Sequence, residues 1–136
     1  MTAPYKPAGY NTVSAYLVVD GAQGVIDFLK KTFDATELRR FDMPDGSIMH
    51  VEVRIDDTVV MMGERGGNSP TFPSMLHVYV PDVDETYRRA LAAGGASLQE
   101  PQRKEGDPDK RGGVKDPCGN SWFFATQVGD GTSASL

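Results

Sequence analysis

The sequence repeats one order of predicted elements, and this repeat limits the folds open to the chain. Residues 13–19 predict a strand, and after a tight turn the apolar spacing over residues 22–33 predicts a helix with one buried stripe. Residues 75–80 predict a second strand, and Asp82 is placed to cap a second helix. Asp20 and Asp82 hold corresponding places in the two copies and stand 62 positions apart (82 minus 20).

Each copy continues with a further strand and closes with a hairpin. In the first copy, residues 47–55 and 58–64 flank the turn "DD". In the second copy, residues 111–115 and 120–127 flank the turn "DPCG". A constant offset between two such series predicts two βαβββ modules in tandem.

We expect the whole chain of 136 residues to form one domain. Module one spans about residues 12–64 and module two about residues 75–127. A linker rich in Gly, Pro and Ser joins them over residues 65–74, and the small polar residues 129–136 predict a disordered tail. The charged, glycine-rich stretch 104–113 predicts a flexible loop.

A single helix covers one face of a small sheet and leaves the other face open. The predicted fold class is therefore α+β, with the two βαβββ modules forming a curved mixed sheet around a cavity. A cavity of this kind is the expected place for a ligand.

Composition and charge narrow the classes of partner. The net charge of −5 argues against a nucleic-acid partner, because phosphate binding requires clustered Lys and Arg. The single cysteine, Cys118, allows no internal disulfide and lies in a turn sequence, which disfavours a catalytic role. The chain shows no signal peptide and no apolar run of ~20 residues, so we expect a cytoplasmic protein without a membrane partner.

Five motifs occur in a specific order: "YLVVDG", "VIDFLKKTFDATE", "IMHVEV", "LHVYVPDVD" and "DPCGNSW". Together they resemble the vicinal oxygen chelate superfamily, in its glyoxalase/bleomycin resistance protein/dioxygenase-like branch. The resemblance covers residues 13–126. Three positions depart from the usual pattern, where Leu29 replaces Tyr, Asp34 replaces Gly and Asn120 replaces His.

The resemblance implies four metal-ligand positions, one on the first and one on the last strand of each module. Metal-using members carry His or Glu there, whereas these positions correspond here to Val13, Met61, Met75 and Phe123. Val and Phe have no donor atom, and a Met thioether does not suit Mn, Ni, Zn or Fe. We therefore expect a cavity without a metal or other cofactor. A relocated site built from His50, Glu52 and His77 is the alternative, since these residue types suit iron or zinc.

Alternation along the strands predicts which side chains face the cavity. Over residues 48–55 the apolar set of Met49, Val51, Val53 and Ile55 is assigned to the helix, which leaves His50, Glu52 and Arg54 to the cavity or to solvent. The candidate ligand-binding residues are His50, Glu52, Met61, Met75, His77, Tyr79 and Phe123. Simple packing of Met and Phe, and a cross-strand pair of Glu52 with Arg54, are the alternatives.

These features favour a metal-free protein that binds a small organic molecule. Methionine and aromatic side chains suit a planar, aromatic or semi-apolar ligand, such as a peptide-like antibiotic held in a resistance role. The resemblance also implies a homodimer. The alternative is a metal-dependent lyase, isomerase or dioxygenase that uses the relocated site. A metal-free acid–base enzyme is the third reading, but no spacing singles out a catalytic pair, and no catalytic residue is assigned.

Overall fold

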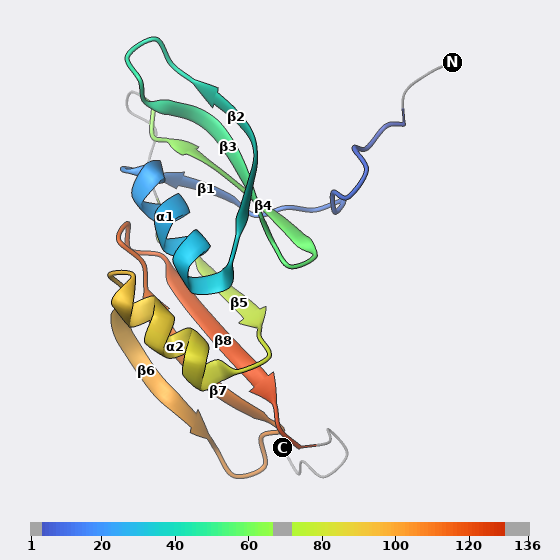
Figure 1. Cartoon of the computed structure of the whole chain (residues 1–136), viewed down its shortest axis with the longest axis vertical. Coiled ribbons are helices and arrows are strands. Elements are labelled where there is room, and N and C mark those ends of the chain that lie inside the picture. The colour runs from blue at the N-terminus through green and yellow to red at the C-terminus, as the bar shows by residue number, and fades with distance from the viewer. Residues whose placement is uncertain (1–3, 67–71, 130–136) are drawn as a thin grey trace. The chain divides into compact units, whose positions relative to one another are not determined.

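The computed structural model describes residues 4–66 and 72–129 of the chain. The chain divides into two compact units, residues 1–72 and 73–136, which we call the first and the second module (Figure 1). Parts of the predicted linker and tail, residues 67–71 and 130–136, lie outside the described residues.

The first module is a mixed four-stranded sheet with one helix. Its elements are β1 (Tyr16–Val19), α1 (Ala22–Phe33), β2 (Thr36–Asp42), β3 (Ile48–Ile55) and β4 (Thr58–Glu64), and the strand order is β1-β4-β3-β2. β1 runs parallel to β4 and the other pairs are antiparallel. α1 packs on β3 and β4 with a fully buried stripe that includes Val25, Ile26 and Leu29. The helix ends at Asp34, which adopts a left-handed conformation with φ 56°.

The second module repeats this arrangement. Its elements are β5 (Met75–Tyr79), α2 (Val83–Ala92), β6 (Ala96–Arg103), β7 (Asp109–Lys115) and β8 (Ser121–Gln127), and the strand order is β5-β8-β7-β6. Asp82 caps α2 by accepting hydrogen bonds from the backbone N–H groups of Asp84 and Glu85, as the sequence predicts. Trp122 and Phe124 are fully buried in the core of this module. The predicted α+β class and the two βαβββ modules are confirmed.

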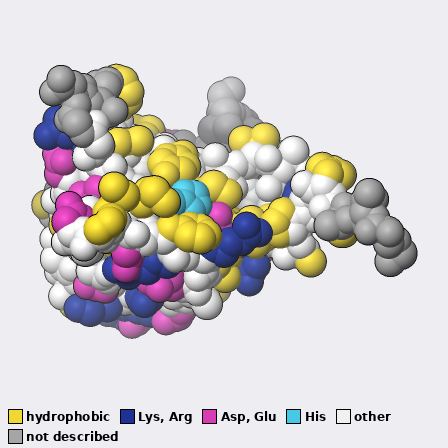
Figure 2. All heavy atoms as spheres, turned by 90° about the horizontal axis from the view of Figure 1, so that it is seen from above, with side chains coloured by type: hydrophobic (Ala, Val, Ile, Leu, Met, Phe, Trp, Pro, Cys, Tyr) yellow, Lys and Arg dark blue, Asp and Glu magenta, His cyan; other side chains and the backbone are white. Residues whose placement is uncertain are grey.

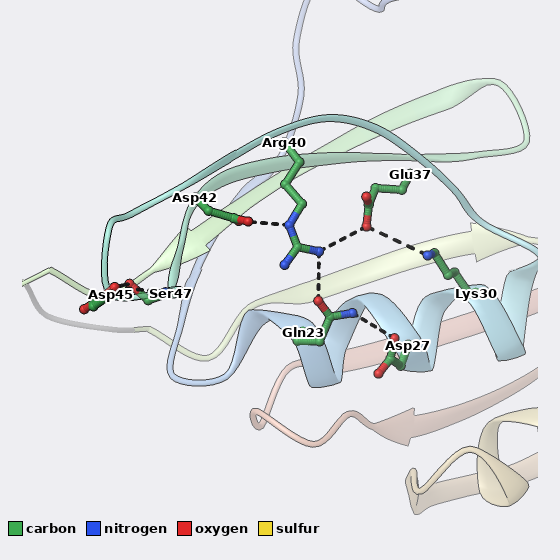
Figure 3. A network of polar contacts seen from close by, with 8 residues as sticks. All are labelled: Gln23, Asp27, Lys30, Glu37, Arg40, Asp42, Asp45 and Ser47. Carbon is green, nitrogen blue, oxygen red and sulfur yellow. Dashed lines mark hydrogen bonds and ion pairs between the residues drawn. The ribbon is translucent and has the colours of Figure 1, made fainter.

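A network of polar side chains joins α1 to the edge strand β2 (Figure 3). The guanidinium of Arg40 donates to Gln23 on α1 and to Asp42 on its own strand, and it also pairs with Glu37. Glu37 in turn pairs with Lys30 at 3.8 Å. These side chains are exposed or half-buried, so the network links α1 to the edge strand but adds little stability.

Two details of the strands differ from the sequence prediction. Met49 is 53% exposed and Ile48 is buried instead, because the pairing of β2 with β3 shifts between Phe41 and Asp42 and moves the start of β3 by one residue. The predicted loop over residues 104–113 is also wrong in its second half. β7 begins at Asp109, two residues before the strand predicted over residues 111–115, so residues 109–113 belong to a strand and not to a loop.

The strand register relates the two modules position by position. Tyr16 pairs with Met61 in the first module, and His77 pairs with Phe123 in the second. Met61 and Phe123 are both half-buried positions on the last strand of their module, and we match them at the predicted offset of 62 positions (123 minus 61). Tyr16 and His77 then correspond at an offset of 61 (77 minus 16), because the paired positions are 45 residues apart in the first module (61 minus 16) and 46 in the second (123 minus 77).

This shift moves one position of the sequence alignment. Ser14, and not Val13, becomes the counterpart of Met75. β1 is also shorter than predicted, and Val13 lies before it with an exposed fraction of 82%.

Candidate ligand-binding faces

A buried carboxylate lies on the face of the first sheet that α1 does not cover, which we call the uncovered face. Glu52 on β3 is only 5% exposed and accepts a hydrogen bond from the hydroxyl of Tyr10. Its second oxygen lies 2.9 Å from Nε2 of His50, and the guanidinium of Arg39 lies 3.7 Å from the first. Arg39 also stacks over the ring of Tyr10 at 5.1 Å.

These contacts decide the charge of the carboxyl group. Burial of Glu52 raises its pKa, but the hydrogen bonds from His50 and Tyr10 and the charge of Arg39 lower it, and the net shift is downward. The same contact with Glu52, together with burial, raises the pKa of the Tyr10 hydroxyl. Glu52 is therefore an anion at neutral pH, and Tyr10 is a neutral donor.

The segment that precedes β1 lies over this part of the sheet. Asn11 accepts a hydrogen bond from the backbone N–H of Val59 at 2.9 Å, and Arg54 donates to the carbonyl of Gly9. A pocket of about 370 Å³ lies between the segment and the sheet. It is lined by Tyr5, Lys6, Pro7, Tyr10, Asn11, Thr12, Arg39, Glu52 and Met61.

Two aromatic side chains, Tyr16 and Phe41, lie beside His50. The ring centroids of Tyr16 and Phe41 lie 5.5 Å and 6.1 Å from that of His50, and the hydroxyl of Tyr16 lies 3.2 Å from Nδ1. Tyr16, Phe41, Met43 and Met49 are each about half exposed. Figure 2 shows hydrophobic side chains gathered around a histidine on one face of the molecule. This part of the first module offers an apolar surface next to hydrogen-bonding groups.

The uncovered face of the second sheet carries a different set. Met75, His77 and Tyr79 alternate along β5 on its exposed side. The ring of Phe123 on β8 packs against Gly113 of β7, where an added Cβ would come within 2.5 Å of it. An aromatic platform therefore lies beside the histidine of β5.

Charged groups of β7 hold His77 and Tyr79. Asp109 is 5% exposed, accepts a hydrogen bond from the Tyr79 hydroxyl at 2.7 Å and pairs with Arg111 at 3.0 Å. Arg111 also donates to Asp107 and, at 3.3 Å, to Nε2 of His77. Burial and then the charge of Arg111 lower the pKa of His77, which Asp109 opposes in part. The hydrogen bond to Asp109 raises the pKa of Tyr79.

The structure separates the predicted ligand-binding residues by module. His50, Glu52 and Met61 lie together in the first, since Met61 pairs directly with Glu52. The alternative of a pair between Glu52 and Arg54 is contradicted, because Glu52 is buried and is paired with His50 and Arg39. Sequence reasoning missed Tyr10 and Arg39, whose spacing from Glu52 follows no pattern.

The side chains at the implied metal positions do not fit a divalent metal ion. Val13, Met61, Met75 and Phe123 offer no nitrogen or oxygen donor, and the register replaces Val13 only by a serine. Within residues 4–66 and 72–129, no group of three or more His, Cys, Asp or Glu side chains is arranged to hold a metal. Of the relocated set, His50 and Glu52 are hydrogen-bonded to one another through the atoms that would bind the ion.

Comparisons with known proteins agree with this architecture. The profile of the Glyoxalase/Bleomycin resistance protein/Dioxygenase superfamily matches residues 10–124. An uncharacterised protein of Mycobacterium tuberculosis is 39% identical over 127 residues, which cover 85% of this chain and 74% of that protein.

Two solved structures are similar to the chain. TioX from Micromonospora sp. ML1 has a TM-score of 0.68 and 25% identity, with 85% of this chain and 95% of TioX covered. A mutant of the fosfomycin resistance protein FosX from Listeria monocytogenes, complexed with Mn(II) and 1S,2S-dihydroxypropylphosphonic acid, has a TM-score of 0.68 and 17% identity over 91% of this chain and 94% of FosX. No helix among the described residues is long and apolar enough to cross a membrane.

Proposed function

We propose that this chain, which belongs to the Glyoxalase/Bleomycin resistance protein/Dioxygenase superfamily, binds a planar or semi-apolar organic molecule without the help of a metal ion. One observation carries the proposal. In each module the helix covers one face of the sheet, and the other face presents exposed aromatic and methionine side chains beside a nearly buried, hydrogen-bonded carboxylate. Such a surface stacks on a flat ligand and orients it through a few polar groups.

Seven residues are proposed to contact ligand. In the first module these are His50, Glu52 and Met61, and in the second they are Met75, His77, Tyr79 and Phe123. Methionine adapts to the outline of an irregular ligand, and the flat ring of Phe123 offers a stacking surface. An aromatic or peptide-like antibiotic has the required chemistry, and its sequestration would give resistance.

Isothermal titration calorimetry against planar aromatic and glycopeptide antibiotics tests this proposal. Fluorescence of Trp122 is a poor readout, because this side chain is fully buried and donates to Asp116. We expect at least one compound to bind with a dissociation constant well below ~1 mM. Phe123→Ala should weaken binding, whereas Tyr87→Phe, which removes a hydroxyl on α2, should not. Failure of the whole panel to bind contradicts the proposal.

Metal analysis separates binding from the alternative enzymatic function. A lyase, isomerase or dioxygenase of this fold would need a divalent ion, and the donor set argues against one. Stoichiometric Ni, Zn, Mn or Fe in protein purified without chelators, lost in His77→Ala, would establish the alternative. The homodimer and the cytoplasmic location stay predictions, and light scattering of the purified protein checks the first.

A further inference from the structure

We propose that the uncovered face of the first module selects aromatic molecules that carry a hydrogen-bond donor, and that the hydroxyl oxygen of Tyr16 accepts this donor. The inference rests on the proposed function and specifies the chemistry of its ligand. It follows from which atom donates in each hydrogen bond of a series of three side chains, Glu52, His50 and Tyr16.

The series begins at Glu52. An ionised carboxylate has no hydrogen to donate and acts only as an acceptor. Glu52 is ionised at neutral pH, because its partners lower its pKa despite burial. The contact of 2.9 Å between Glu52 and Nε2 of His50 therefore places a proton on Nε2. Tyr10 donates to the other oxygen, and Arg39 adds its positive charge, so each neighbour of the carboxylate favours the anion.

The series then passes through the imidazole. A neutral histidine with its proton on Nε2 has an acceptor lone pair at Nδ1. The hydroxyl of Tyr16 lies 3.2 Å from Nδ1 and, with this tautomer, donates a hydrogen bond to it. The lone pairs of the Tyr16 oxygen remain for a ligand, and each hydrogen bond in the chain increases the electron density at the next acceptor.

The surroundings of Tyr16 favour an aromatic ligand. Its side chain is 48% exposed, and Phe41, whose ring centroid lies 6.1 Å from that of His50, is 50% exposed. Gly63 on β4 lets the phenol reach across the strand, because a Cβ at Gly63 would lie 2.9 Å from the Tyr16 hydroxyl. A flat molecule stacked on these side chains reaches the hydroxyl with a substituent at its edge.

Two aromatic probes that differ in one donor test the inference. 2-Naphthol carries a hydroxyl donor and 2-methoxynaphthalene carries none. Calorimetry at pH 7.5 measures the dissociation constant of each, and the ratio of the two constants cancels the shared stacking contribution. Relative to Tyr16→Phe, we expect the wild-type ratio to favour 2-naphthol by about fivefold, the size expected of one partly exposed hydrogen bond.

Two further variants sharpen the test. Glu52→Gln keeps the shape of the side chain but offers both a donor and an acceptor. It therefore no longer fixes the direction of the hydrogen bonds through His50 to Tyr16, and it should reduce the preference for 2-naphthol as Tyr16→Phe does. Tyr87→Phe removes a hydroxyl that bonds Ser97 and should keep the wild-type ratio. Circular dichroism confirms that each variant is folded.

The outcomes distinguish the inference from the function on which it rests. Binding of both probes with the same ratio in wild type and Tyr16→Phe overturns the inference and leaves a binding function standing. No binding of either probe to the wild type contradicts the binding of flat aromatic molecules itself, and with it the inference.

Discussion

The charged side chains on the uncovered faces are arranged in compensating groups. Asp109 is nearly buried, and its carboxylate receives the Tyr79 hydroxyl and the Arg111 guanidinium. A buried carboxylate without partners destabilises the folded protein, and removal of one partner of a buried pair costs roughly 3–5 kcal/mol of folding free energy. The guanidinium of Arg111 that pairs with Asp109 also lies beside His77. Its positive charge therefore disfavours protonation of the His77 imidazole.

Removal of that guanidinium should therefore raise the pKa of His77. In Arg111→Gln the positive charge that opposes protonation is absent, while Asp109 remains to favour the imidazolium. An NMR titration of the His77 ring protons measures the change. Lys115→Gln, which removes another cation from β7, is the matched control and should leave the titration in place. An unchanged or lower pKa in Arg111→Gln would contradict the proposed contact.

Sequence reasoning located part of each residue cluster. Strand alternation placed His50 and Glu52 on the same side of β3, and the structure confirms that they contact one another. It did not identify Tyr10, because this residue comes from the segment before β1 and lies 42 positions from Glu52. Nor did it identify Arg111 as a partner of His77, although the sequence predicts a strand over residues 111–115.

At the scale of the elements, close approach between neighbouring strands depends on glycine. A Cβ at Gly113 would come within 2.5 Å of the ring of Phe123, so Gly113→Ala should destabilise the protein by about 1–3 kcal/mol, as overpacking does. Urea unfolding measures this, and in a Phe123→Ala background the same substitution should cost much less. Gly24→Ala, in α1 with open space around it, is the control and should stabilise by about 0.5–1 kcal/mol.

The elements themselves could be predicted because each has one apolar side. The buried stripe of α1 and the hairpin from Ile48 to Glu64 follow from the spacing of apolar residues. The start of β7 could not, since Asp109, Lys110 and Arg111 carry no apolar alternation. They form a strand because their backbone pairs with β6 and β8. Their polar side chains form ion pairs with one another and with a residue of α2.

At the scale of the molecule, each module has its own sheet, helix and core, and the repeat seen in the sequence identifies both. The comparison of registers shows how the copies have diverged. Glu52 and Gly113 correspond, because each is paired with the matching residue of the last strand, Met61 or Phe123. The first module thus places a buried anion where the second places an aromatic ring over a glycine. Sequence alignment at a fixed offset of 62 could not reveal this, because Glu52 and Gly113 stand 61 positions apart (113 minus 52).

The second module should lose stability at mildly acid pH through His77. Its pKa in the folded state lies below the ordinary value near 6.5, so the unfolded chain binds more protons in this range. The stability contributed by neutral His77 is present above pH ~6.5 and is lost as the pH falls through the folded pKa.

The only tryptophan, Trp122, is buried in this module, and its fluorescence follows urea unfolding there. Between pH 7.5 and 5.5 the urea midpoint should fall in the wild type and fall less in His77→Gln. Asp107 does not contribute to this fall, because hydrogen bonding to the backbone of Asp109 lowers its pKa and it stays ionised over this range. An equal fall in both proteins would show that His77 does not cause the loss of stability.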